Sequence, residues 1–279
     1  MEPFPRLEDL TLMDDYMFGT VMQDPKLIKP LIEFILDIRI RTVTYIEPQR
    51  SMKSGLNAKG VRLDLYVEDE NGVVYNVEVQ TSDKKNLPRR MRYYQSTIDI
   101  SILKQGVDYK ELKASYVIFI CNYDEFGRGR YIYTFENTCR EEPGLTFGDD
   151  AYKVVVNTKG CRGEVSEELM EAIRYLDDGS VTGEYSRELD DAVKAVKASE
   201  ERRLEYMLLV TRDNEMRAEG REEGRKEGLK EGRVEGREEE RISIIRNMMK
   251  NLGWPFQKVL DALGITDPEE RTRLAGKIG

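Results

Sequence analysis

Residues 60–80 read GVRLDLYVEDENGVVYNVEVQ and have the pattern of two strands joined by a tight turn. Apolar and polar residues alternate on both sides of the turn, as expected for half-buried strands that share one apolar face. Asp64 lies on the polar face of the first strand, and Glu78 and Gln80 lie on that of the second. The expected apolar face consists of Leu63, Leu65, Val67, Val73, Tyr75, Val77 and Val79, and the opposite face includes Tyr66.

The length of the connecting loop decides whether the two acids meet. A two-residue turn would put Asp64 and Glu78 on opposite faces and the apolar residues out of register. A three-residue loop, 70–72, with Gly72 in the left-handed region, pairs Asp64 with Glu78 and Leu65 with Val77. Only this register keeps the apolar residues together. It leaves the two carboxylates on one face, with their Cβ atoms about 5 Å apart.

Two like charges at this spacing destabilise a hairpin unless a cation lies between them. One interpretation is a solvated face on which both acids point at water. The other is a hard divalent ion, Mg²⁺ or Mn²⁺, which one or two carboxylates hold together with water and a phosphate. Asp64 and Glu78 supply the carboxylates, and the carbonyl of Val79 is a candidate third ligand.

The composition narrows the chemistry further. The chain has 279 residues, 35% of them charged, a net charge of −9 and no histidine. The missing histidine excludes Ser-His-Asp hydrolases, Cys-His proteases and Cys/His zinc sites. Three isolated cysteines give no disulfide framework, and no apolar run has the length of a membrane span, so a cytoplasmic protein without a membrane partner is expected. Catalysis must then use carboxylates, Lys, Tyr or an oxygen-bound metal.

A basic cluster opens the helix that is predicted over residues 84–105. Basic side chains are unfavourable at a helix N-terminus, so their clustering suggests an external anion such as a phosphate of DNA. A solvated helix start is the simpler alternative. Met91, Tyr94, Ile98 and Ile102 form the apolar stripe of this helix. The candidate DNA contacts are Lys84, Lys85, Arg89, Arg90, Arg92 and Gln95.

The remaining segments predict a mixed α/β sheet flanked by helices. Helices are expected within 9–37 and at 167–178, strands at 40–47, 114–122, 130–137 and 151–157, and a polar link at 51–60. The last two strands are expected at a sheet edge. Changes in composition divide the chain into three parts: 1–183, a charged helical segment 184–241, and a small helical tail 242–279.

The charged segment is expected to be one long helix with glycine at every fourth position from Gly220 to Gly236. Five interior glycines cost a helix about 5 kcal/mol relative to alanine, while Glu–Arg and Glu–Lys pairs return about 0.2–0.5 kcal/mol each. Such a helix would gain stability from a partner on the glycine side. Self-association into a homo-oligomer and a flexible charged spacer are the two interpretations. The tail is expected to form about three short helices and to serve as a packing or interaction module.

Four motifs resemble the Rpn family of recombination-promoting nucleases, which are also described as transposases and belong to the PD-(D/E)XK nuclease superfamily. They are DDYMF (14–18), DLYVEDENGVVYNVEVQ (64–80), RRMRYYQ (89–95) and KQGVDYKELKASYVIFI (104–120), and the similarity covers roughly residues 10 to 160. The resemblance implies a restriction-endonuclease-like fold in residues 1–183 and a metal-dependent DNA endonuclease linked to recombination or mobile DNA.

The resemblance also assigns roles to residues. Asp64 and Glu78 match the metal ligands of the family, and Gln80 lies where the wider superfamily usually has lysine. Gln80 has no charge and cannot act as a base, so it would orient water or phosphate by hydrogen bonds. Asp15 or Glu33 would add an outer carboxylate. The alternatives are RNA cleavage, or a catalytically degenerate nuclease fold that acts as a DNA-binding or oligomeric interaction protein.

Overall fold

The computed structural model describes residues 5–52 and 60–278. Contacts divide the chain into two compact units, Met1–Met207 and Leu208–Gly279. The predicted polar link at 51–60 falls largely on residues 53–59, which lie outside the described residues. The predicted division into 1–183, 184–241 and 242–279 stays a prediction.

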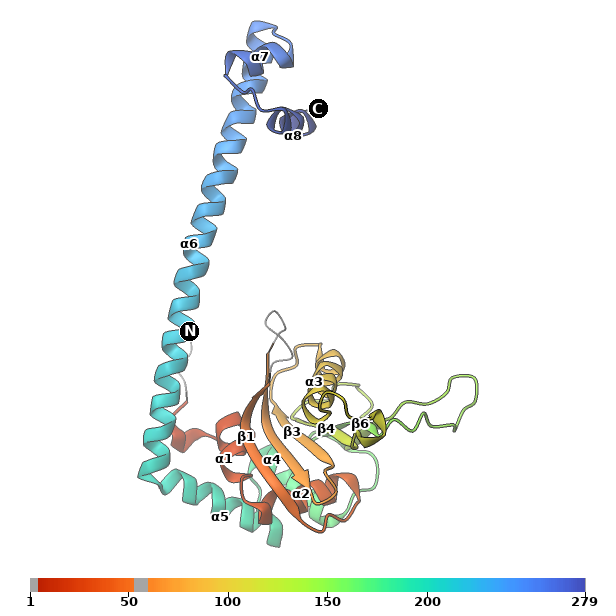
Figure 1. The fold of residues 1–279 in the computed structure, drawn as a ribbon. Helices are drawn as coiled ribbons and strands as arrows, with labels where there is room; N and C mark the ends of the chain where they lie inside the picture. Colours follow the sequence, from red (N-terminus) through yellow and green to blue (C-terminus); the bar gives the residue numbers. More distant parts are fainter. Residues whose placement is uncertain (1–4, 53–59, 279) are drawn as a thin grey trace. The chain divides into compact units, whose positions relative to one another are not determined.

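A six-stranded mixed sheet forms the centre of the first unit (Figure 1). Its strand order is β1-β2-β3-β4-β6-β5. The pairs β3·β4 and β4·β6 are parallel, and the other three are antiparallel. β5 is an edge strand as predicted, whereas β6 is an inner strand. The strands are β1 (Val43–Met52), β2 (Val61–Asp69), β3 (Val74–Gln80), β4 (Ser115–Cys121), β5 (Ile132–Phe135) and β6 (Ala151–Asn157).

Helices flank the sheet, so the predicted mixed α/β fold is confirmed (Figure 1). Helix α3 packs on β4 and covers one face, while α1 and α2 pack against strands at the β1 side of the sheet. Tyr185 ties α5 to α2, because its hydroxyl donates to the carbonyl of Leu27 at 2.7 Å. The helices of this unit are η1 (Leu7–Asp9), α1 (Asp15–Val21), α2 (Pro25–Leu36), α3 (Leu87–Ile102), η2 (Tyr109–Glu111), α4 (Glu167–Asp178) and α5 (Glu184–Ala198).

The central hairpin has the predicted loop and register. Leu65 pairs with Val77, the N–H of Asp69 donates to the carbonyl of Val73 at 3.1 Å, and Gly72 has a φ of 77°. Residues 70–72 are therefore a three-residue loop with a left-handed glycine, as predicted.

The expectation of half-buried strands is wrong for this hairpin. Every residue of β3 is buried, and so are most residues of β2. β3 lies between two neighbours, and α3 covers the face on which Glu78 lies. The two acids are therefore shielded by the core, which rules out a solvated face as the interpretation of the hairpin.

The alternation of β2 is interrupted at Asp64. Leu63 was expected on the face opposite Tyr66, yet both belong to the apolar cluster beneath α3. On β1, Gln49 has a φ of 53° and is skipped in the pairing that joins Pro48 to Leu65 and Arg50 to Leu63. Asp64, which lies opposite Gln49, is skipped as well, and the register is the same on both sides of this gap.

The charged segment 184–241, predicted as one long helix, is divided into two helices at Ser199, and the second extends beyond residue 241. Helix α5 ends at Ala198, and α6 (Glu200–Leu252) follows after Ser199, which has an extended backbone. The hydroxyl of Ser199 accepts the N–H of Arg202 at 3.3 Å and so caps α6. The end of α6 precedes Gly253, whose φ is 65°.

The second unit has a small core of its own. The last part of α6 packs with α7 (Phe256–Ala262) and α8 (Pro268–Ile278), in agreement with the predicted short helices. None of the helices in the described part of the chain is long and apolar enough to cross a membrane. The core of this unit consists of Ile245, Val259, Leu260, Ile265 and Leu274.

Candidate active site

Asp64 and Glu78 are linked where β2 and β3 separate. The regular pairing ends at Leu65 and Val77, one step before the two acids. Beyond that point, Glu78 Oε1 accepts the backbone N–H of Asp64 at 2.9 Å, and Asp64 Oδ2 accepts the backbone N–H of Val79 at 3.2 Å. The prediction that Asp64 and Glu78 form a ladder pair of the hairpin is therefore wrong. Each carboxylate instead accepts a backbone N–H of the neighbouring strand, and the two acids lie next to each other without being paired in the ladder.

Burial sets the electrostatics of this pair. Glu78 is fully buried and Asp64 is 6% exposed. Burial, followed by the negative charge of Asp15, raises the pKa of Asp64 to about 7. Burial and the charge of Asp64 raise the pKa of Glu78 well above its ordinary value. Both carboxylates are thus costly to ionise without a cation, which is the electrostatic condition that a metal ion relieves.

Arg90 of α3 provides positive charge inside this site. Its Nη2 lies 3.1 Å from Glu78 Oε2, and its Nη1 donates to Gln80 Oε1. Gln80 is itself held from its other end, since its Nε2 donates to the carbonyl of Ser82 at 2.8 Å. The structure therefore brings together Asp64, Glu78, Gln80 and Arg90.

The guanidinium of Arg90 is fixed by aromatic contacts that sequence reasoning missed. Its Nε donates to the hydroxyl of Tyr94 at 3.0 Å, and its carbon lies 5.1 Å from the Tyr94 ring centroid and 4.8 Å from that of Phe119. Tyr94 was expected only in the apolar stripe of this helix. The spacing of four residues between Arg90 and Tyr94 is a signal that could have identified the contact, because such residues lie side by side on a helix.

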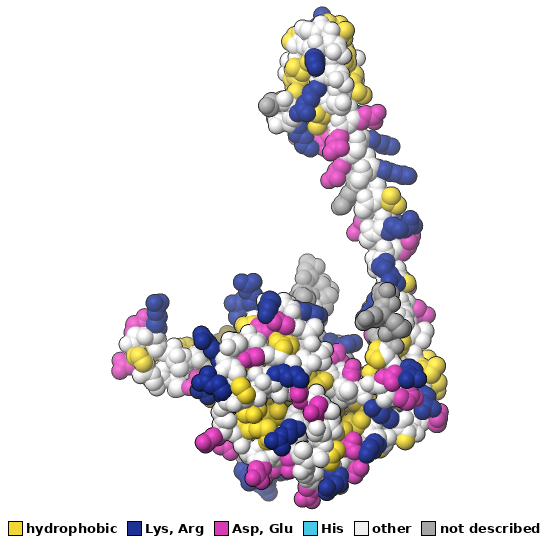
Figure 2. All heavy atoms as spheres, turned by 180° about the vertical axis from the view of Figure 1, so that it is seen from behind, with side chains coloured by type: hydrophobic (Ala, Val, Ile, Leu, Met, Phe, Trp, Pro, Cys, Tyr) yellow, Lys and Arg dark blue, Asp and Glu magenta, His cyan; other side chains and the backbone are white. Residues whose placement is uncertain are grey.

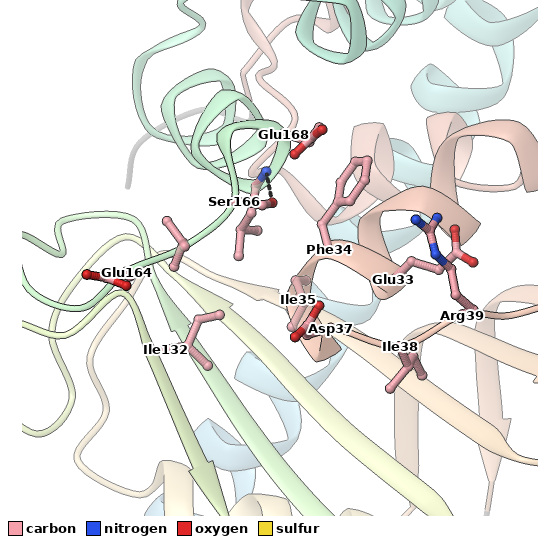
Figure 3. Close-up of a pocket in the computed structure, with 12 residues that line it drawn as sticks. Glu33, Phe34, Ile35, Asp37, Ile38, Arg39, Ile132, Glu164, Ser166 and Glu168 are labelled. Atoms are coloured by element: carbon pink, nitrogen blue, oxygen red, sulfur yellow. Dashed lines mark hydrogen bonds between the residues drawn. The ribbon is translucent and has the colours of Figure 1, made fainter.

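The structure separates the two candidates for an outer carboxylate. Asp15 begins α1, and its charge acts on Asp64. Burial raises the pKa of Asp15, with Arg62 and Arg90 acting in the opposite direction. Glu33 instead lines a different pocket of about 530 Å³ (Figure 3). Its Oε1 accepts the N–H of Ile40 at 2.8 Å, which fixes the chain after α2.

The predicted DNA contacts fall into three groups, and the first is Arg90, which pairs with Glu78 inside the site. Lys84, Lys85, Arg89 and Arg92 are exposed around the start of α3, and Lys85 pairs with Asp83. Gln95 is 5% exposed, and its Nε2 donates to Ser115 Oγ. Gln95 is therefore part of the packing between α3 and β4 and is removed from the candidate contacts. On the face shown in Figure 2, basic and acidic side chains are interspersed.

The donor set of the site suits a hard divalent ion. Within residues 5–52 and 60–278, no group of three or more Asp, Glu or Cys side chains is arranged to hold a metal. Mg²⁺ needs only one or two carboxylates, because water and substrate phosphate complete its shell. Asp64 and Glu78 provide those carboxylates, and each carboxylate oxygen has a second lone pair beyond the hydrogen bond that it accepts. The role of the Val79 carbonyl stays a prediction.

Comparison with known proteins gives one match. No curated protein and no solved structure matches the chain. Residues 14–138, which contain Asp15, Asp64, Glu78, Gln80 and Arg90, match the family model described as PD-(D/E)XK nuclease family transposase. The match supports the predicted resemblance, and this region is similar to a family of nucleases linked to mobile DNA.

Proposed function

We propose that the protein is a Mg²⁺- or Mn²⁺-dependent DNA endonuclease that hydrolyses phosphodiester bonds in recombination or in the movement of mobile DNA. The observation that carries this proposal is the buried pair Asp64–Glu78 at the separation of β2 and β3, with hydrogen bonds that fix both carboxylates. The family match over residues 14–138 supports the reaction class.

In this proposal Asp64 and Glu78 hold the metal ion, with the carbonyl of Val79 as an additional oxygen ligand. When bound, the ion supplies positive charge against the phosphate and lowers the pKa of water in the site. Gln80 is neutral, so its part is to orient other groups by hydrogen bonds. Asp15 adds negative charge next to Asp64 and so strengthens the attraction of the site for a divalent cation.

DNA binding is assigned to the exposed basic residues around the start of α3, namely Lys84, Lys85, Arg89 and Arg92. Phosphate contacts of this kind position the nucleic acid without reading its sequence. The negative net charge of the whole chain restricts the attraction to such a local surface. A cytoplasmic location fits this role and remains a prediction from the cysteine pattern.

The second candidate is a catalytically degenerate nuclease fold that binds DNA or forms an oligomer. It is favoured by the ion pair between Arg90 and Glu78, because an internal cation already offsets part of the buried charge. Self-association through the glycine-spaced part of α6 is compatible with either candidate: a Cβ at Gly224 or Gly228 would meet no atom within 4 Å.

A cleavage assay on supercoiled plasmid DNA distinguishes the two candidates. The full chain is incubated with Mg²⁺, with Mn²⁺ or with EDTA, beside Asp64→Ala and Glu78→Ala, and a structured RNA serves as a second substrate. We expect nicked or linear DNA only with metal and only with the unchanged protein. Equal cleavage by Asp64→Ala, with both variants folded by circular dichroism, would refute the assignment. DNA binding without metal uptake would favour the degenerate fold.

A further inference from the structure

Arg90 is partly exposed to solvent, although neutralising the buried Glu78 would not require this. Its side chain is 28% exposed, whereas the Glu78 side chain is fully buried, so the side chain of Arg90 links the buried carboxylate to solvent. A residue that only neutralised Glu78 would gain nothing from an exposed edge. The location is that of a group with one side in the protein and one side open to a ligand.

The hydrogen bonds of Arg90 leave a defined set of donors. The guanidinium carries five N–H groups. In the described part of the chain, Nε donates to the Tyr94 hydroxyl, Nη1 to Gln80 Oε1 and Nη2 to Glu78 Oε2. One N–H therefore remains on each terminal nitrogen. Each of these N–H groups can donate to a phosphate oxygen, and the planar, charged guanidinium offers both from one side chain, which lysine does not.

The surroundings make this donor pair rigid. The Tyr94 and Phe119 rings lie against the guanidinium, and Gln80 is held by Ser82 from behind. Donors that are fixed before the reaction stabilise developing charge without reorganisation. Gln80 cannot provide charge itself, but its amide oxygen sets the orientation of a residue that can.

We propose that Arg90 is a catalytic residue that donates to the non-bridging oxygens of the scissile phosphate, and that Gln80 and Tyr94 are its positioning residues. This inference rests on the proposed nuclease function. In the hydrolysis, water supplies a hydroxyl group to phosphorus and a proton to the leaving oxygen, and one P–O ester bond breaks. Arg90 exchanges no proton in this step. It stabilises the charge that develops on the phosphate oxygens.

The test compares Arg90→Gln and Arg90→Lys with the unchanged full chain. Arg187→Gln, an exposed arginine on α5, is the matched control. Three quantities are measured: the single-turnover cleavage rate with Mg²⁺, the Ca²⁺ dissociation constant by calorimetry without DNA, and the rate of Arg90→Gln after addition of free guanidinium. Arg90→Lys keeps the charge beside Glu78 and guards against a folding defect in Arg90→Gln.

We expect Arg90→Gln to lower the rate by about 10²–10³-fold, the range seen when one oxyanion donor is removed. Arg90→Lys should recover only a small part of this loss, because lysine lacks the planar fork. Ca²⁺ affinity should be unchanged or higher, since a positive charge has left the site, and added guanidinium should partly restore cleavage.

Three results would overturn the inference. Cleavage by both variants at the rate of the unchanged protein would remove Arg90 from catalysis and leave the nuclease function intact. A rate loss with weaker Ca²⁺ binding and no rescue by guanidinium would show that Arg90 only supports the carboxylates. No metal-dependent cleavage by the unchanged protein would refute the proposed function, and the inference with it.

Discussion

The side chain of Glu78 accepts the backbone N–H of Asp64, at 2.9 Å. The Asp64 carboxylate in turn takes a donor from the strand of Glu78, the N–H of Val79. Each acid is thus oriented by the strand of the other. This reciprocal arrangement couples the geometry of the site to the separation of β2 and β3, and it makes the effects of substitution at either acid specific enough to predict.

Asp64→Asn should strongly reduce cleavage without loss of stability. Asparagine keeps the shape of the Asp64 side chain and an oxygen that accepts the Val79 N–H. It removes the buried negative charge, which burial and the neighbouring Asp15 make unfavourable. We expect cleavage to fall at least about 10²-fold, and the metal-free melting temperature to stay equal or rise. Plasmid nicking and thermal unfolding in EDTA measure the two effects. Asp37→Asn, at an exposed left-handed position after α2, is the control and should change neither.

Stability of the metal-free protein should fall as pH rises from about 4 to about 7. The pKa of Asp64 is about 7 in the folded chain, above the unfolded value of about 3.9. Within this window the folded state binds more protons than the unfolded state, so raising the pH favours unfolding. Melting temperatures in EDTA across this range test the slope. The slope should be smaller in Asp64→Asn, and a rising curve would contradict the assignment.

Asp15→Asn should weaken Ca²⁺ binding, whereas Glu33→Gln should not. Removal of the Asp15 charge should lower the pKa of Asp64, shift the pH dependence of metal-free stability to lower pH, and weaken Ca²⁺ binding. Glutamine at position 33 can still accept the Ile40 N–H and lies in the other pocket. Calorimetry with Ca²⁺ measures the difference. A loss of affinity in Glu33→Gln alone would reverse the assignment of the outer carboxylate.

Neutral substitutions on the exposed basic surface should reduce the salt dependence of DNA binding. Arg89→Ala and Arg92→Ala are each expected to lower the slope of log K against log salt by about 1, the value for one phosphate contact. The measurement is fluorescence anisotropy with Ca²⁺ at several salt concentrations. Gln95→Ala should leave the slope unchanged and lower stability instead, because Gln95 packs on Ser115.

Alanine at Gly224 and Gly228 should stabilise α6. Both positions are helical, with no atom within 4 Å of an added Cβ, so each change should add about 0.5–1 kcal/mol to helix stability. Circular dichroism reports this gain. If the glycine side is a contact with a second copy, the same changes should also weaken assembly in sedimentation experiments. Unchanged sedimentation would support the spacer interpretation.

The sequence predicted the elements of the fold because its signals are local. The loop 70–72 and the pairing of Leu65 with Val77 follow from the turn and the apolar alternation. The same local pattern could not reveal that β3 is buried on both faces, because that depends on α3 and β4. Nor could it reveal the interruption at Asp64, which involves Gln49 on another strand.

The proximity of Asp64 and Glu78 could be predicted from the sequence, but the contact of Arg90 with Glu78 could not. Asp64 and Glu78 lie on adjacent strands, so their proximity follows from one register. Arg90 reaches Glu78 from a helix that the sheet brings over the hairpin, a tertiary contact with no short-range signal. For the same reason, the choice between Asp15 and Glu33 needed the packing of α1 and α2.

The loop at 70–72 has a consequence for how this chain can vary. Asp69, the last residue of β2, lies five positions after Asp64, a span of about 17 Å along an extended strand. An inserted residue that kept a three-residue loop would slide β3 by one position along β2, and Val77 would take the place of Glu78. The residue types of this exposed turn can therefore vary, but its number of residues cannot. An insertion that an ordinary surface turn would tolerate should abolish cleavage here.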